Sequence, residues 1–100
     1  MYSIYRSMSF VDGYIHILFT DSIQVYADNP SLTLVKEISI ATGNTESPSM
    51  AIQNNLLVYC IKEICKILNI TGGYTETLEI KLEKLVTDVA ISYPYLIIAH

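Results

Sequence analysis

The residues best suited to chemistry are two cysteines and two histidines. Cys60 and Cys65 flank Lys62-Glu63. If those two residues form a hairpin turn, the cysteines face each other across two strands, where a disulfide is geometrically feasible. A structural zinc site needs about four ligands, which this pair does not supply. With no secretion signal at the N-terminus, we expect two reduced thiols that pack as small apolar side chains, and no metal.

The other ionisable residues form no catalytic pattern. His16 lies inside an apolar stretch, which predicts a packed structural side chain. Asp12, Asp21 and Asp28 fall at predicted turns, where aspartate bonds its own backbone, and their spacing matches no calcium loop. No Ser-His-Asp, Cys-His or paired-carboxylate arrangement is visible. The sequence therefore predicts a chain that is not an enzyme and has no cofactor.

Tyrosine is the main enrichment, with eight residues. Three tyrosines fall inside apolar stretches and are predicted to pack there. Three others lie next to predicted turns, where an exposed aromatic side chain can anchor a partner. The candidate partner-binding residues are therefore Tyr74, Tyr93 and Tyr95.

Composition excludes several classes of protein. The chain has 100 residues, of which 51% are hydrophobic and 16% charged, with a net charge of −4. This apolar content argues against disorder, and the negative charge argues against a nucleic-acid surface. The apolar runs are too short for the roughly 18 to 20 residues of a membrane-spanning helix. We expect a cytoplasmic protein, with peripheral membrane association as an alternative.

An internal repeat organises the chain. Residues 7–19 align without a gap on residues 49–61, an offset of 42, and residues 89–98 align on residues 50–59, an offset of 39. The first copy predicts strands at residues 7–11, 14–19, 22–27 and 32–40. Asp12-Gly13 and Asn54-Asn55 supply residues that tolerate the positive φ of tight hairpin turns.

Strands 14–19 and 56–61 are apolar on both faces, which indicates sheets covered on both sides. Four-stranded antiparallel units that recur about every 40 residues are typical of β-propeller blades. We therefore predict an all-β chain with blades at 7–48 and 49–87 and the start of a third at 88–100. A β-sandwich is the alternative fold.

Two further expectations concern single segments. Segment 78–86 alternates like a strand from Leu78 to Leu82, while its Leu, Glu and Lys also favour helix; the alternation and its place in the repeat predict a strand. Loops 41–47 and 71–75 are predicted to lie at the rims of the blades, where binding residues usually occur.

Several stretches resemble a middle blade of the PROPPIN family, the phosphoinositide-binding propellers of autophagy. They are Ser-Ile-Gln-Val-Tyr at 22–26, Leu-Thr-Leu-Val-Lys-Glu-Ile at 32–38, Pro48, and Met-Ala-Ile at 50–52. The resemblance implies a propeller that acts in autophagy or membrane trafficking. The family's Phe/Leu-Arg-Arg-Gly lipid-binding motif is absent from the chain, so lipid contact is expected only through regions outside it. Residues 88–98 are also similar to one strand of citron-homology propellers.

The sequence thus predicts a non-catalytic scaffold or interaction module with protein partners. The alternative is a small sugar-binding or enzymatic propeller or sandwich. Because propellers close with roughly four to eight blades, two blades and a fraction need further chain or self-association to form a ring. Three copies would supply about seven blades.

Overall fold

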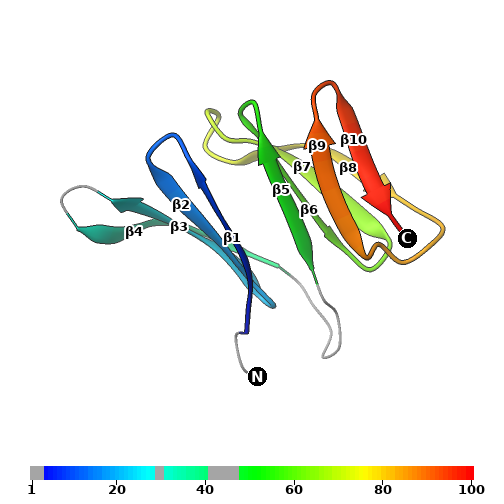
Figure 1. Ribbon diagram of the computed structural model, residues 1–100, viewed down its shortest axis with the longest axis horizontal. Helices are drawn as coiled ribbons and strands as arrows, with labels where there is room; N and C mark the ends of the chain where they lie inside the picture. Colours follow the sequence, from blue (N-terminus) through cyan, green and yellow to red (C-terminus); the bar gives the residue numbers. More distant parts are fainter. Residues whose placement is uncertain (1–3, 29–30, 41–47) are drawn as a thin grey trace. The chain divides into compact units, whose positions relative to one another are not determined.

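The chain folds into antiparallel β-strands joined by short turns (Figure 1). The structure is a computed structural model that describes residues 4–28, 31–40 and 48–100. The predicted rim loop 41–47 lies outside these ranges. The strands are β1 (Tyr5–Val11), β2 (Tyr14–Phe19), β3 (Ser22–Asp28), β4 (Leu32–Ser39), β5 (Ser49–Gln53), β6 (Leu56–Ile61), β7 (Ile64–Asn69), β8 (Thr75–Lys81), β9 (Asp88–Ser92) and β10 (Tyr95–Ala99).

The strands form two compact units. Unit 1, Met1–Glu46, contains one four-stranded sheet in the order β1-β2-β3-β4. Unit 2, Ser47–His100, contains a second sheet in the order β5-β6-β7-β8 and the two-stranded hairpin β9-β10. Every neighbouring pair of strands is antiparallel and consecutive in the chain. This is the topology of β-propeller blades, and it confirms the predicted fold class.

Over the described ranges, no helix is long and apolar enough to cross a bilayer.

The sequence repeat is also a repeat of strand register. From the Ser7–Leu18 pair onward, the cross-strand pairs of β1–β4 recur in β5–β8 with an offset of 42 residues; Ser49 pairs with Cys60, for example. The β3–β4 ladder shifts register after Val25, and the β7–β8 ladder shifts after Ile67, again 42 positions later. The two sheets therefore share this irregularity of the ladder between their third and fourth strands.

The tight turns follow from residues that adopt positive φ. Asn54 and Asn55 join β5 to β6 with φ of 51° and 66°, and Asp12 and Gly13 join β1 to β2 with φ of 52° and 82°. Two central residues with positive φ define a type I′ turn, whose twist matches that of the flanking strands. Lys62 also takes a positive φ, 54°, in the β6–β7 turn, although Lys62-Glu63 is not a residue pair typical of such turns.

The core of unit 2 lies between the second sheet and the hairpin. Val58 and Cys60 of β6 and Cys65 of β7 are buried on one face of the sheet, together with Val86 and Val89. Partly buried side chains complete this core: Ala51, Ile67, Ile80, Leu82, Ile91, Leu96 and Ile98. Strand β9 lies against β5 and β6, as Figure 1 shows. The period of two along β9 and β10 turns Val89, Ile91, Leu96 and Ile98 toward the sheet and leaves Ile97 exposed on the other face.

The chain after β8 departs from the predicted strand at 78–86. Strand β8 ends at Lys81, the Leu82 N–H makes one further bond in the register of the ladder, and the chain then folds back toward the β6–β7 turn. Leu82 N–H donates to the Glu63 carbonyl at 2.6 Å, and Val86 N–H donates to the Lys62 carbonyl at 2.7 Å. These bonds bring Val86 into the core, which alternation along the sequence could not reveal.

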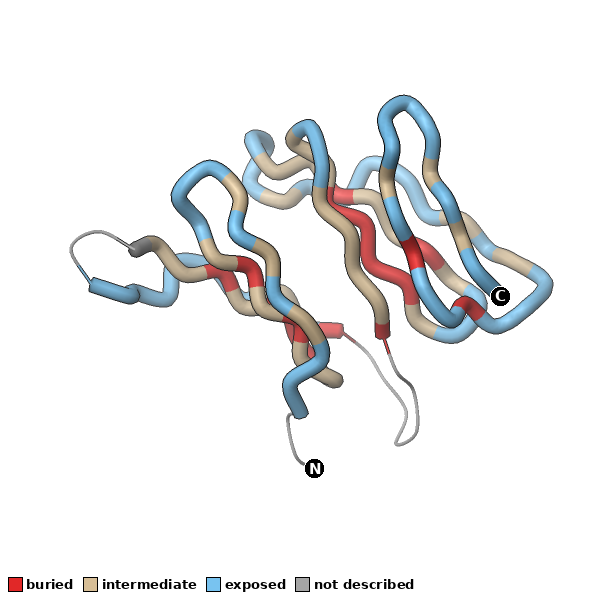
Figure 2. Tube along the Cα trace, in the orientation of Figure 1, coloured by how far each residue is buried: buried red, intermediate tan, exposed pale blue. Residues whose placement is uncertain are grey.

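Buried positions concentrate on the middle strands of each sheet (Figure 2). In unit 1, one face of the sheet carries the buried residues His16, Leu18, Ile23 and Val25. The opposite face carries side chains that are more exposed, including Met8 and Phe10. The difference between the faces follows the strand period of two.

Val58 offers a test of the core of unit 2, because it is only 2% exposed. We expect Val58→Ala to lower the free energy of unfolding by about 2 kcal/mol through lost packing and a residual cavity. Urea unfolding followed by circular dichroism measures this change. Leu78→Ala is the control, because Leu78 lies on the same face of the sheet but is 52% exposed; its effect should stay within about 0.5 kcal/mol. Equal effects of the two substitutions would contradict the described core.

Candidate functional site

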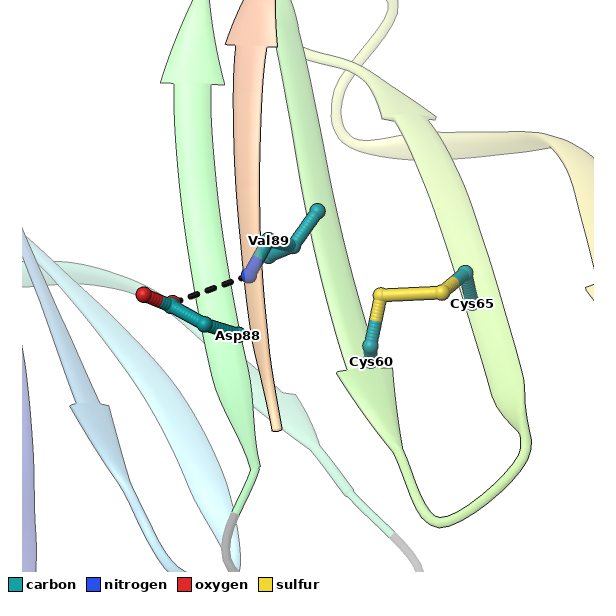
Figure 3. Close-up of a disulfide and its surroundings, with 4 residues drawn as sticks. All are labelled: Cys60, Cys65, Asp88 and Val89. Carbon is teal, nitrogen blue, oxygen red and sulfur yellow. Dashed lines mark hydrogen bonds between the residues drawn. A yellow bond between two sulfur atoms is a disulfide. The ribbon is translucent and has the colours of Figure 1, made fainter. Parts of the chain in front are cut away.

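The two cysteines form a disulfide across the β6–β7 hairpin (Figure 3). Cys60 and Cys65 are opposite each other in the ladder, with Cα atoms 4.1 Å apart. A two-residue turn makes the flanking Ile61–Ile64 pair hydrogen-bonded and the cysteine pair non-hydrogen-bonded, which is the closer of the two arrangements. The expectation of reduced thiols was therefore wrong. Both side chains are buried in the core of unit 2, so the bond is a structural one.

His16 occupies the interior of β2, as predicted. It is 1% exposed and lies opposite Ser9 of β1 and Val25 of β3, with Lys36 of β4 next in the same row. Burial lowers the pKa of His16 from its ordinary value of 6.5, although a hydrogen bond with the Tyr14 backbone opposes the shift. The imidazole is therefore neutral near pH 7 and acts as a packed side chain.

Among residues 4–28, 31–40 and 48–100, no three His, Cys, Asp or Glu side chains gather closely enough to hold a metal ion.

A network of side-chain hydrogen bonds joins the β5–β6 turn to the β7–β8 loop. Asn55 Nδ2 donates to Asn69 Oδ1 and to Thr71 Oγ1, each at 2.8 Å. The Thr71 N–H donates to Asn55 Oδ1 at 2.8 Å, and the Gly72 N–H donates to Asn69 Oδ1 at 3.2 Å. Asn55 thus uses both ends of its amide within the chain. The network fixes the two turns to each other.

A second contact joins the β9–β10 turn to the same end of the sheet. The Tyr93 N–H donates to Gln53 Oε1 at 2.7 Å, across a separation of 40 residues. Figure 1 shows the turns after β5, β7 and β9 at one end of unit 2. We call this surface the neutral rim and define it as residues 53–56, 69–75 and 92–95.

The neutral rim contains no lysine, arginine, aspartate, glutamate or histidine. The opposite end of unit 2 differs, because the β6–β7 turn is Lys62-Glu63 and residues 81–88 carry further charges. A polar surface without charge costs less to dehydrate than a charged one and suits an uncharged partner.

All three candidate tyrosines lie on the neutral rim. Tyr93 occupies the β9–β10 turn and is 62% exposed, and Tyr95 begins β10 and is 70% exposed. Tyr74 ends the β7–β8 loop with φ 64° and is half-buried. The structure thus brings Tyr93 and Tyr95 together on one hairpin and places Tyr74 on a different turn at the same end.

Charged side chains form a separate cluster on the other face of the second sheet. Lys66 Nζ lies 3.5 Å from Glu76 Oε1 and 3.7 Å from Glu79 Oε1. Burial raises the pKa of the neighbouring Tyr59 hydroxyl. The pKa of Lys66 is also raised, first by its interaction with Tyr59 and then by the two carboxylates, against the effect of desolvation. Ion pairs this exposed contribute about 0 to 1 kcal/mol and do not form a catalytic centre.

Sequence reasoning located the tyrosines but missed the polar network beneath them. Asn54-Asn55 was identified as a turn, and the Asn69-Ile70-Thr71 stretch is visible in the sequence. Their connection depends on the pairing of β6 with β7, which brings Asn69 beside Asn55. The Gln53–Tyr93 bond likewise depends on how the hairpin packs on the sheet.

Comparisons with known proteins agree with the fold. No family profile matches the chain, and no curated protein sequence matches it. Among solved structures, Hsv2 of Kluyveromyces marxianus matches with a TM-score of 0.62 and 13% identity over 99% of this chain and 33% of that chain. Two structures of Kluyveromyces lactis Hsv2 match with TM-scores of 0.62 and 16% identity over 98% of this chain and 30% and 31% of those chains. Hsv2 is a PROPPIN β-propeller. The chain therefore has the fold of propeller blades and spans about a third of the solved chains it matches.

The burial of His16 predicts a measurable pH dependence. Because its folded-state pKa is lowered, the unfolded chain binds more protons as the pH falls below 6.5. The stabilising contribution of the neutral imidazole is complete above that pH. It is lost toward lower pH by at most about 1.4 kcal/mol per pH unit.

His16→Val is the matched variant, because Val58 occupies the corresponding position of the repeat. Urea unfolding between pH 7.5 and about 5 should show a smaller loss of stability for this variant than for the natural chain. Identical pH profiles would show that His16 is not buried as described.

Proposed function

We propose that this chain is a non-catalytic interaction module of a β-propeller related to the phosphoinositide-binding propellers of autophagy. In this proposal residues 7–48 and 49–87 are successive blades, and residues 88–100 begin a third. The register shared by the two sheets and the similarity to PROPPIN structures support it. The module works in the cytoplasm, and its membrane association depends on lipid contacts made by regions outside these residues.

The neutral rim is the proposed surface for protein partners. The observation that carries this proposal is that three turns are fixed to one another by hydrogen bonds and still expose two large aromatic side chains. A rigid surface loses little conformational entropy on binding. Tyrosine adds a large contact area with few rotatable bonds, and Asn, Gly, Ser and Thr around it are the residues common in protein-binding loops.

The hydrogen bonds of the rim favour a protein over a sugar as its ligand. Recognition of a sugar requires free polar groups that bond the ligand's hydroxyls. The Asn55 amide is already engaged at Nδ2 and at Oδ1 by Asn69 and Thr71. The side-chain oxygen of Gln53 is likewise engaged by Tyr93. The rim therefore offers aromatic contact area more than free hydrogen-bonding groups.

Substitution of the exposed tyrosines tests this proposal. The natural chain, used as bait, should capture partner proteins from a cell extract. We expect the double variant Tyr93→Ala/Tyr95→Ala to capture these proteins at least about tenfold less, because exposed aromatic anchors dominate binding energy. Quantitative mass spectrometry of the captured proteins measures the loss. Leu85→Ala is the control, because Leu85 is 62% exposed and lies outside the rim. Equal capture by the natural chain and the double variant would contradict the proposed surface.

Vesicle sedimentation tests the lipid part of the proposal. The 100-residue chain should sediment equally with vesicles that contain or lack phosphatidylinositol phosphates, because the proposal places lipid contact outside it. Sedimentation that requires these lipids would assign lipid binding to the present residues instead.

A further inference from the structure

The disulfide is enclosed by the chain that follows β8. Cys60 and Cys65 are 1% and 0% exposed. Val86 and Val89 belong to the same buried cluster as the two cysteines. Figure 3 shows Val89 on β9, beside β6, one of the two strands that the disulfide joins. We call residues 82–89 the cover. A disulfide exchanges with an external thiol only where a sulfur is accessible, so the cover controls access to this bond.

The cover is anchored at the turn that the disulfide closes. Lys62 and Glu63 form this β6–β7 turn, between the two cysteines. The Leu82 N–H donates to the Glu63 carbonyl at 2.6 Å, and the Val86 N–H donates to the Lys62 carbonyl at 2.7 Å. The disulfide therefore holds the turn that anchors the cover, and the cover shields the disulfide. Two elements that stabilise each other in this way also open together.

Unit 1 shows that the fold does not require sulfur at this position. With the offset of 42 residues, the two cysteines correspond to Leu18 and Ile23, which form the equivalent buried pair. The Ile40 N–H donates to the Asp21 carbonyl at 2.9 Å, in the place of the bond made by the Leu82 N–H. Two apolar side chains thus fill this part of the sheet without a covalent bond. The disulfide adds a property that packing alone does not supply.

The reduced form of the pair also has a place in this core. Ser49 of β5 lies opposite Cys60 in the β5–β6 ladder, so the two side chains leave the sheet on the same face. Within the part of the chain that the structure describes, the buried Ser49 hydroxyl oxygen has no hydrogen-bond partner. A free Cys60 thiol is a weak donor that can bond this oxygen. Both oxidation states are therefore compatible with the fold.

From these contacts we infer that Cys60–Cys65 is a redox switch and that the cover sets the rate at which a dithiol reductant reaches it. When the cover opens, a thiolate of the reductant attacks one cysteine sulfur, the Cys60–Cys65 bond breaks, and the released sulfur takes a proton. The second thiolate of the reductant then displaces the other cysteine and closes the reductant's own disulfide. Two electrons and two protons have passed to the chain. The freed turn holds the cover less firmly, so reduction prolongs the open state.

The inference takes one element from the proposed function, which is the cytoplasmic location. Dithiol reductants keep most thiols reduced there, and the disulfides that do form are usually transient or redox-sensing. A purified chain and a synthetic dithiol test the switch without any partner. A failure of that test removes the switch and leaves the proposed partner surface of the neutral rim untouched.

Reduction kinetics test the shielding. Dithiothreitol, a small dithiol, should reduce the folded natural chain at least about a hundredfold more slowly than the chain unfolded in urea, because only the open fraction reacts. Alkylation of the released thiols followed by mass spectrometry measures the rate. Val86→Ala should raise the rate at least about tenfold, because it removes packing from the cover. Val25→Ala is the matched control, because Val25 is also buried but lies in unit 1; it should change the rate less than about twofold. Equal effects of the two substitutions would overturn the inference.

Hydrogen exchange followed by NMR tests the coupling between the disulfide and the cover. Reduction of the natural chain by dithiothreitol should speed exchange of the Leu82 and Val86 amides at least about tenfold. The Ile40 amide makes the equivalent bond in unit 1, and its exchange should change less than about twofold. The double variant Cys60→Leu/Cys65→Ile carries the residues of unit 1 at these positions. Dithiothreitol should change exchange at none of these amides in that variant.

Two further results would overturn the inference. One is reduction of the folded natural chain as fast as that of the unfolded chain. The other is exchange at Leu82 and Val86 that stays the same when the disulfide is reduced. Both measurements use the natural chain, so they decide the matter even if a variant fails to fold.

Discussion

The structure depends on one constraint: its central strands are apolar on both faces. In β6, Leu57 and Tyr59 are buried on one face of the sheet, and Val58 and Cys60 are buried on the other. A sheet built on such a strand must be covered on both sides, because its apolar surface is otherwise left in water. In unit 2 the hairpin β9–β10 covers one side of β6. Within unit 2 the repeat itself meets this requirement on that side, because the hairpin is a further copy of the first two strands of the sheet that it covers.

The same constraint separates apolar, uncharged polar and charged residues into different parts of unit 2. Apolar side chains occupy the middle of the strands, while the turns at one end carry tyrosine, asparagine and glycine without charge. Charged residues lie on the outer strand β8, on β7 at Lys66, and at the opposite end. The disulfide lies in the buried layer between sheet and hairpin, where it ties β6 to β7. A stiff framework of this kind can hold exposed loops in fixed positions without taking part in binding itself.

Local features of the sequence were sufficient to predict most of the fold. The positive-φ turn at Asn54-Asn55 and the apolar run of β6 depend only on neighbouring residues. The offset of 42 residues predicted the register of a second sheet from the first. The path after Leu82 was predicted wrongly, because it is set by a hydrogen bond from Val86 to Lys62 that no local pattern reveals.

The candidate site was less predictable for a similar reason. Tyr93 and Tyr95 were recognisable from their position beside a turn, but the bonds that fix those turns join residues 14 to 40 positions apart. The disulfide also escaped prediction. A buried thiol pair and a disulfide have the same sequence and the same place in the ladder, so spacing alone does not distinguish them.

Cross-strand nuclear Overhauser effects between Hα atoms test the blade architecture most directly, because they occur at the close, non-hydrogen-bonded pairs of an antiparallel sheet. The account predicts strong effects between Met50 and Tyr59, Cys60 and Cys65, and Leu96 and Ile91, so that consecutive strands are neighbours throughout. Strong effects between β5 and β8, or between β6 and β9, would instead show the crossed strand order of a β-sandwich and would contradict the account.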